Sequence, residues 1–482
     1  MTNSRRRRRT NREVANPTAV LHNHGKQNLP PISSVFSRFL LPELHRQVIL
    51  HLARDDLESY ALASRAFNRE ANYVLWRAIR VSLLKQKPEG IETFAQALRR
   101  DPVRAANIRH ITFTCIPESW SPTYRPLALY IFARHPTEEF WRLLEDALRL
   151  ITRTNSIRLL LPDELFRRCR NDTLFPDRFT DVISNVFKAS HIANLHAYIR
   201  SDRLFELCQS WPSLTTLHVE GLSWYSRDAL VALPSSALPL LRHLKSDPSL
   251  MHYITPGRPI ETWYHAGEDP CLKGTSEEQE NMKRLTATIR SCETLQRVRV
   301  ECEAYNDDDA VGFLPAFAHD TLRNLHLWIS WELQPDIDNE EASDRLTPST
   351  LMRGLPPGAL ALFPKLEVLQ ITLEHEHFAF VNRDPDGEDK HIVANALAAF
   401  LTSESPATLC QVEVDFYFHR YSHYYHFHRP TCSALRFLAA RCDDHWDVEI
   451  AYTEGPLATT TLGSPRQVPS ALINKGWDPF ET

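Results

Sequence analysis

Hydrophobic residues recur along most of the chain in one short phrase: an aliphatic residue, two variable residues, a second aliphatic residue, one variable residue and a third. The alternation at its end is typical of a half-buried strand. Leu214 and Leu241 are 27 residues apart, Leu241 and Leu295 are 54 apart, and Leu295 and Leu322 are again 27 apart. A fixed period predicts a stack of units that bury their apolar faces against their neighbours. The clear instances begin at Ile108, Leu214, Leu241, Leu295, Leu322, Leu366 and Leu409, and a further one lies around Ile157, Leu159 and Leu161.

Helical periodicity separates several of these phrases. Residues 91 to 100 are predicted to form a helix that ends before Pro102, because proline cannot continue it. Residues 137 to 151 carry an apolar stripe at helical spacing, which predicts a strongly amphipathic helix. Residues 256 to 280 have no period and are predicted to form a loop or an excursion from the stack.

Residues 39 to 80 carry three short helical patterns in succession. Pro42 suits the first position of the first helix, because its missing N–H would be unpaired there in any case. Asp55 and Ser64 are predicted N-caps of the second and third helices, and the third pattern continues to Ile79. The first helix has a stripe of apolar residues four apart: Leu44, Val48 and Leu52. Three helices of this length cannot bury all of their apolar faces against one another. The remainder faces either the rest of the chain or a partner.

Six groups of anchors in this segment stand in a specific order: Leu41 to Leu44, Ile49 to Leu52, Asp56 with Leu57, Leu62 to Arg65, Phe67, and Leu75 to Arg77. This order resembles the F-box, a three-helix module that docks its protein onto the Skp-type adaptor of a cullin-RING (SCF-type) ubiquitin ligase. The resemblance implies a substrate receptor. The residues that match the apolar anchors of the family, and are expected to face the adaptor, are Leu41, Pro42, Leu44, Val48, Ile49, Leu62, Ala63 and Trp76.

The recurring phrase is similar to that of leucine-rich repeats, and an F-box followed by degenerate repeats resembles an arrangement of fungal F-box proteins. Leucine-rich repeats usually place asparagine or cysteine three residues after the third apolar position. Here those positions hold Leu222, Glu303, Ser330, Glu374 and Tyr417, so we expect an irregular arc rather than a smooth one. The expected fold is of the α+β or α/β class, with a three-helix F-box module followed by an irregular leucine-rich-repeat-like solenoid of short strands and helices.

Four parts are expected along the chain: a disordered basic tail over residues 1 to 35, the helical module over 36 to 80, the repeat domain over 81 to 460, and a tail or cap over 461 to 482. The tail contains five consecutive arginines, Arg5 to Arg9, and the net charge of the whole chain is −5. The run suits a nuclear-import signal or a solvated tail; an acidic body does not favour nucleic acid. No apolar run reaches the roughly 20 residues that span a bilayer, and a cytoplasmic or nuclear location without a membrane partner is expected.

An acidic stretch offers a candidate recognition surface. Residues 301 to 345 contain twelve Asp or Glu against Arg323 and Arg345. One interpretation is a solvated loop; the other is a patch that attracts a basic segment of a protein substrate, with tryptophans as apolar anchors. The candidate substrate-binding residues are Asp307, Asp308, Asp309, Trp328 and Trp331.

Catalytic chemistry has little support in the sequence. Histidines gather at residues 375 to 377 and 419 to 428, but no spacing completes a known metal-ligand set, and no phosphate-binding or nucleophile motif is present. We therefore expect a non-catalytic protein without a cofactor or metal, which binds adaptor and substrate. The alternatives are an interaction scaffold without ubiquitin transfer, or a metal-dependent enzyme in which His423, His426 and His428 converge.

Overall fold

The computed structural model describes Ile49 and residues 54–63, 65–83, 88–114, 137–160, 174–197, 201–219, 233–234, 236–246, 248–265, 276–304, 317–331, 359–375, 389–420, 431–442 and 445–456. The chain divides into two compact units, Met1–Leu75 and Trp76–Thr482. Within the described ranges, no helix is both long and apolar enough to cross a membrane.

The first unit contains the helices α3 (Arg54–Ala63) and α4 (Arg65–Leu75). Leu57 and Ala71 are buried in it, as is Ile49, which lies in helical backbone. Asn68 Nδ2 donates to the Ala61 carbonyl at 3.2 Å and joins the start of α4 to the end of α3. The prediction that Asp55 caps the second helix is wrong, because Asp55 lies inside α3.

The second unit is built on one open sheet of thirteen strands, whose spatial order is the same as their order in the sequence. Neighbouring strands are parallel from β1 to β11, and β12 and β13 complete the sheet as antiparallel strands. The strands are β1 (Ala78–Ser82), β2 (His110–Thr114), β3 (Ser156–Leu160), β4 (Asn194–Ala197), β5 (Thr216–Val219), β6 (His243–Ser246), β7 (Thr262–His265), β8 (Arg297–Ala304), β9 (Asn324–Trp331), β10 (Val368–His375), β11 (Gln411–Arg420), β12 (Thr431–Cys442) and β13 (His445–Pro456). The expected mixed α/β class is confirmed. Ile79 belongs to β1 and not to the third helix of the N-terminal segment.

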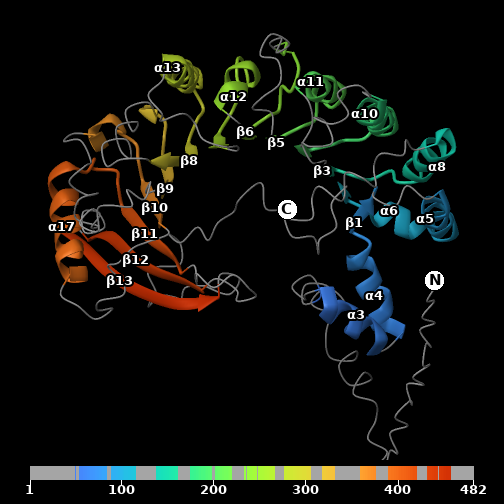
Figure 1. The fold of residues 1–482 in the computed structure, drawn as a ribbon, viewed down its shortest axis with the longest axis horizontal. Coiled ribbons are helices and arrows are strands. Elements are labelled where there is room, and N and C mark those ends of the chain that lie inside the picture. Colours follow the sequence, from blue (N-terminus) through green and yellow to red (C-terminus); the bar gives the residue numbers. More distant parts are fainter. Residues whose placement is uncertain are drawn as a thin grey trace, which may run out of the picture. The chain divides into compact units, whose positions relative to one another are not determined.

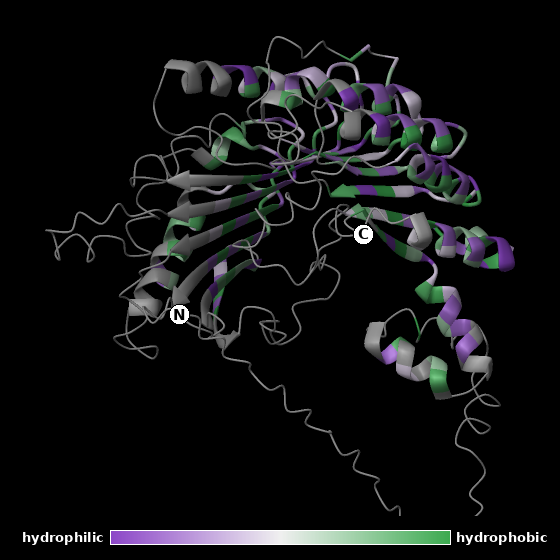
Figure 2. Ribbon diagram, turned by 45° about the vertical axis from the view of Figure 1, so that its right-hand side comes forward, coloured by the Kyte–Doolittle hydropathy of each residue, from purple (hydrophilic) through white to green (hydrophobic). Residues whose placement is uncertain are grey.

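Helices connect the strands and lie along the outer side of this sheet (Figure 1). They are α5 (Pro88–Arg100), α6 (Pro102–Asn107), α8 (Glu138–Leu148), α10 (Leu174–Phe187), α11 (Ser201–Ser210), α12 (Pro248–Ile254), α13 (Ser276–Ser291), the 3-10 helix η6 (Ala359–Leu362) and α17 (Asp389–Glu404). Both sequence-predicted helices of this unit are confirmed as α5 and α8, and Thr137 Oγ1 caps α8 by accepting from the Phe140 N–H at 3.2 Å. Figure 2 shows hydrophobic and hydrophilic residues side by side along these helices, as their amphipathic pattern requires.

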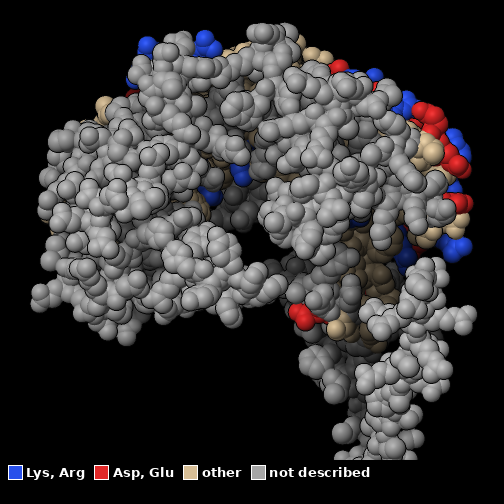
Figure 3. All heavy atoms as spheres, in the orientation of Figure 1, with Lys and Arg blue, Asp and Glu red and all other residues tan. Residues whose placement is uncertain are grey.

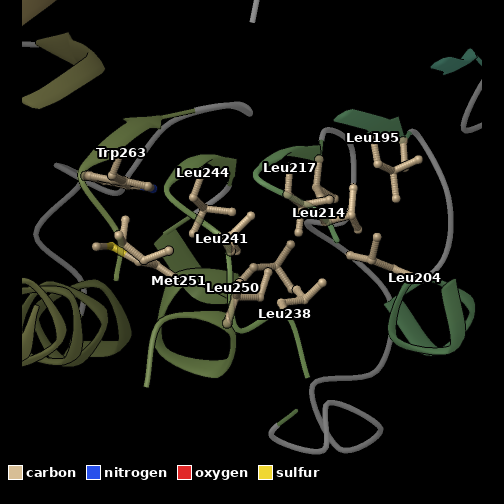
Figure 4. Packing of buried hydrophobic residues seen from close by; sticks show 14 of the residues in the cluster. Leu195, Leu204, Leu214, Leu217, Leu238, Leu241, Leu244, Leu250, Met251 and Trp263 are labelled. Carbon is tan, nitrogen blue, oxygen red and sulfur yellow. The ribbon is translucent and has the colours of Figure 1, made fainter. Parts of the chain in front are cut away.

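The core lies between the sheet and the helices, and the recurring phrase builds it. The second apolar position of each unit pairs with the second apolar position of the next, strand after strand. This row runs through Ile79, Ile111, Ile157, Leu195, Leu217, Leu244, Trp263, Val298, Leu325, Leu369 and Val412. From Ile111 onward each member is buried. Figure 4 shows Leu195, Leu217, Leu244 and Trp263 packing toward the leucines of the helices and turns.

Among the units from β2 to β11, two were not recognised from the sequence pattern. In β4 the phrase reads Ile192, Leu195 and Ala197, and in β7 it reads Ile260, Trp263 and His265. The prediction that residues 256 to 280 lie outside the stack is therefore wrong, because β7 pairs with both β6 and β8 and α13 begins at Ser276. Spacing also varies, since Leu244 and Trp263 are 19 residues apart while Ile111 and Ile157 are 46 apart.

Adjacent units are joined by a regular backbone ladder at the start of each strand. In each unit from β2 to β11, two successive N–H groups donate to a single carbonyl of the preceding unit at 2.7 to 3.2 Å; Arg323 and Asn324, for example, both donate to Gln296. A second ladder is made by hydroxyl groups, each of which donates to the first apolar residue of the preceding unit. Its members are Ser213 to Ile192, Thr294 to Ile260, Thr321 to Leu295 and Thr408 to Leu366, at 2.6 to 2.9 Å.

Candidate functional site

The face of the sheet opposite the helices is here called the inner face, and from β1 to β9 its Lys and Arg residues gather in the first two inward positions of each strand, whereas the next two positions of β8 hold Glu301 and Glu303. Side chains alternate between faces along a strand, so the residues between the buried apolar positions belong to this face. In the first two inward positions of each of these nine strands there is no Asp or Glu. The Lys and Arg residues there are Arg80, Arg158, Lys245, Arg297 and Arg299, and the histidines are His110, His196, His218, His243 and His326.

Arg299 is the most constrained of these cations. Its guanidinium carbon lies 5.2 Å from the ring centroid of Trp328 on β9 and 6.0 Å from that of Tyr264 on β7. Both distances are within the range of a cation–π interaction. The aromatic rings of the two neighbouring strands therefore hold the charge of Arg299 in place on the inner face.

The histidines add polarity to the inner face more than charge. His196 and His218 stack with ring centroids 3.7 Å apart and ring planes 12° apart. His326 Nε2 lies 3.0 Å from Thr372 Oγ1, and burial, together with the positive charge of Arg299, lowers the pKa of His326 to about 3. Burial is also the main cause of the lowered pKa of His243, where Arg297 and Arg242 contribute and Glu261 opposes. The lowered pKa values of His326 and His243 favour their neutral forms, so these two residues add polarity rather than charge to the inner face.

The character of the face changes at β11, where two acidic residues are paired within the sheet. Arg436 Nε on β12 lies 2.9 Å from Glu413 Oε1 and 2.6 Å from Asp415 Oδ1. Burial raises the pKa of Asp415, and the hydrogen bond from Arg436 works in the opposite direction. These carboxylates are held by an internal partner, so the basic part of the face ends before them.

Figure 3 shows Lys and Arg atoms on the inner side, whereas Lys, Arg, Asp and Glu are intermixed on the outer rim. On that rim Arg178 pairs with Glu138 at 3.4 Å and Arg142 pairs with Asp146 at 3.7 Å. A hollow over α8 and α10 is lined by charged side chains of both signs: Glu138, Glu139, Arg142, Glu145 and Arg178. Acidic and basic residues thus alternate on the helices, whereas the first two inward positions of β1 to β9 contain Lys and Arg but no Asp or Glu.

The expected adaptor-facing residues fall in different environments. Leu62 on α3 is 87% exposed, whereas Ile49 is fully buried; Ala63 is the last residue of α3. Trp76 belongs to the second unit, where it is half-buried against the core and the Arg104 guanidinium carbon lies 5.2 Å from its ring centroid. The other four, Leu41, Pro42, Leu44 and Val48, lie outside the described residues.

Of the expected substrate-binding residues, Trp328 lies on the inner face beside Arg299, and Trp331 is the last residue of β9. Asp307, Asp308 and Asp309 lie outside the described residues, so their role stays a prediction. Sequence reasoning missed the basic row, although it has a signal. The residue between the second and third apolar positions of the phrase is arginine in β1, β3 and β8 and lysine in β6: Arg80, Arg158, Arg299 and Lys245.

The described residues contain no group of three or more His, Cys, Asp or Glu placed to hold a metal ion. His423, His426 and His428 lie outside them, and the metal-enzyme alternative is untested. What the described residues do assemble is an extended polar surface with fixed cations, which is suited to binding.

A scan against models of protein families finds no match to this chain, and a search of curated proteins finds none either.

Proposed function

We propose that this chain is a non-catalytic substrate receptor of an SCF-type ubiquitin ligase. In this proposal its N-terminal helices form an F-box that binds a Skp-type adaptor, and its sheet is an irregular leucine-rich-repeat-like solenoid that binds a protein substrate. The receptor would act by proximity, because holding a substrate near the transferring enzyme makes a bimolecular step effectively intramolecular. No cofactor is needed, and the chain would work in the cytoplasm or the nucleus, next to the cullin complex.

The observation that carries the proposal is the exposure of Leu62. It is a large apolar side chain, 87% exposed, on α3, and three helices of this length cannot bury all of their apolar faces against one another. It also stands at a position that matches an adaptor-facing anchor of the F-box pattern. When a partner covers an exposed apolar side chain of this kind, the free energy of the complex is lowered.

The solenoid part of the proposal has separate support. Strands in sequence order, one pairing row of buried apolar residues and the two inter-unit ladders are the features expected when each unit contacts only its neighbours. Such stacks offer long surfaces for binding. On the inner face of this sheet, the guanidinium of Arg299 lies beside the aromatic rings of Tyr264 and Trp328.

The proposal is tested by measuring the affinity of the full chain for a purified Skp-type adaptor, alongside a Leu62→Asp variant. Burying a leucine contributes about 1.5 to 3 kcal/mol, so the variant is expected to bind at least about tenfold more weakly. The matched control is Val103→Asp, which changes an apolar residue that is 67% exposed on α6 of the other unit and should leave affinity unchanged. Circular dichroism checks that both variants keep the parental fold.

No adaptor binding by the folded parent would overturn the ligase role. The remaining candidate would then be an interaction scaffold without ubiquitin transfer. One observation favours that second candidate: Trp76, an expected adaptor residue, instead packs against the core of the sheet unit and under the guanidinium of Arg104. In a scaffold, the C-terminal end of the F-box-like segment would pack against the sheet unit of the same chain instead of binding an adaptor.

A further inference from the structure

We infer that the inner face of strands β1 to β9 binds an extended, Asp- and Glu-rich segment of the partner protein. The inference rests on the proposed role of the sheet as the recognition surface and adds the chemistry of what it recognises. It differs from the sequence-based expectation of a basic substrate, which rested on residues 301 to 345.

Charge complementarity is the first step. Five Lys or Arg residues and no Asp or Glu occupy the first two inward positions of these nine strands, in a chain whose net charge is −5. Acidic residues are absent from these two positions, although they outnumber basic ones in the whole chain, and the first acidic residues on the same alternation are Glu301 and Glu303 of β8. Arg158 is exposed and Arg297 is half-buried, so both can meet solvent-borne carboxylates. Arginine is suited to carboxylates because its planar fork can donate two parallel hydrogen bonds.

The spacing of the cations is the second step. Arg80, Arg158, Lys245 and Arg299 occupy strands β1, β3, β6 and β8, two or three strands apart. Strands lie about 4.8 Å apart, so these cations recur about every 10 to 14 Å along the row. An extended peptide advances about 3.3 Å per residue, and carboxylates three or four residues apart would match this spacing. Separate cations fit separate carboxylates better than they fit one doubly charged phosphate.

The aromatic residues of the inner face argue against a nucleic acid as its ligand. Proteins that bind single strands stack bases on aromatic faces. Here the faces of Tyr264 and Trp328 are already turned to the guanidinium of Arg299.

The test is fluorescence anisotropy on the full chain with labelled peptides of about 12 residues, the length that spans the nine strands when extended. One peptide carries Glu at every third position in a Gly/Ser background, a second carries Gln at the same positions, and a third carries a single phosphoserine. A single-stranded RNA of similar length is the fourth probe. The Glu peptide should bind at least about tenfold more tightly than the Gln peptide, and raising the salt concentration should weaken it, because salt screens exposed charges.

The location of binding is tested with the double variant Arg158→Gln, Arg297→Gln. It should weaken binding of the Glu peptide about five- to tenfold, as expected for the loss of two partly exposed ion pairs. The matched control is Arg142→Gln, Arg149→Gln, which removes the same charge from α8 and its C-terminal cap on the outer side and should leave the affinity for the Glu peptide unchanged. Equal effects of the two double variants would overturn the inference, as would tighter binding of the RNA or exclusive binding of the phosphopeptide through Arg158 and Arg297.

The adaptor assay on the same preparations keeps the two proposals apart. A parent that binds adaptor through Leu62 but not the Glu peptide would overturn only the inference about the inner face. A parent that binds the Glu peptide through the inner face but no adaptor would support the inference and overturn the ligase role.

Discussion

Single hydroxyl groups join neighbouring units of the sheet. Ser213, Thr294, Thr321 and Thr408 each stand one residue before the first apolar position of their unit and donate to a carbonyl of the unit before. Leucine-rich repeats usually rely on an asparagine or cysteine for bonds between turns, and the described chain uses these hydroxyls together with its backbone ladder. The sequence carries this signal as Ser or Thr directly before Leu.

A Thr321→Val variant tests this function of the hydroxyls. The substitution keeps the shape of the side chain but removes the donor to the Leu295 carbonyl at 2.6 Å, so the free energy of unfolding should fall by about 1 kcal/mol. Urea denaturation measures the change. Thr402→Val, which removes a hydroxyl bonded within α17 at an exposed position, serves as the control and should have a smaller effect. Equal effects of both variants would argue against a bond between units that matters to stability.

The partly buried His326 on β9 makes the free energy of unfolding depend on pH. Because the pKa of His326 is lowered from 6.5 to about 3, the unfolded chain takes up the proton first as the pH falls. Stability from this residue is therefore present above pH 6.5 and is lost as the pH falls toward 3; at pH 5 the loss is about 2 kcal/mol. A His326→Gln variant, which can still bond to Thr372, should show a smaller drop in unfolding free energy between pH 7.5 and pH 5 than the parent. An identical drop in both proteins would contradict the assignment.

At the scale of strands and helices, the apolar phrase predicted the sheet well where leucine, isoleucine or valine filled all three positions. The strands of Leu217, Val298, Leu325, Leu369 and Val412 all lie in the sheet with these residues buried. Burial on one face is a strong constraint on register, because a slip of one residue would turn every side chain to the other face.

The units that sequence reasoning missed depart from that composition. In β7 the second and third positions are Trp263 and His265, and in β4 the third is Ala197. Both Trp263 and Ala197 are nevertheless fully buried, and the ring centroid of Trp263 lies 6.4 Å from that of Phe317. A search for leucines alone cannot detect such substitutions.

The candidate site was predicted only in part, for a different physical reason. Trp328 was identified from the sequence, but its neighbour Arg299 was not, since a single cation between two apolar residues is ordinary for a half-exposed strand. Only the pairing of nine strands brings the cations into one row. The charge of a face emerges from the register, whereas the acidic stretch at 301 to 345 is continuous in the sequence and was therefore easy to see.

At the scale of the whole molecule, the division at Leu75 and Trp76 predicts that the sheet unit folds without the N-terminal helices. A fragment starting at Trp76 keeps the ring that packs against its core and keeps β1, which covers the edge of β2. It should retain the circular dichroism signal of the sheet, a single cooperative thermal transition and binding of the Glu peptide, while adaptor binding is lost.

A second fragment, starting at Pro88, is the matched control. It lacks β1 and should expose the pairing edge of β2, so we expect a lower unfolding temperature and association of the fragment in solution. If the fragment starting at Trp76 behaves in the same way, the helices of the first unit are needed to complete the sheet unit. The F-box-like segment would then be part of the scaffold's own structure, and the adaptor-binding role proposed for Leu62 would lose its structural basis.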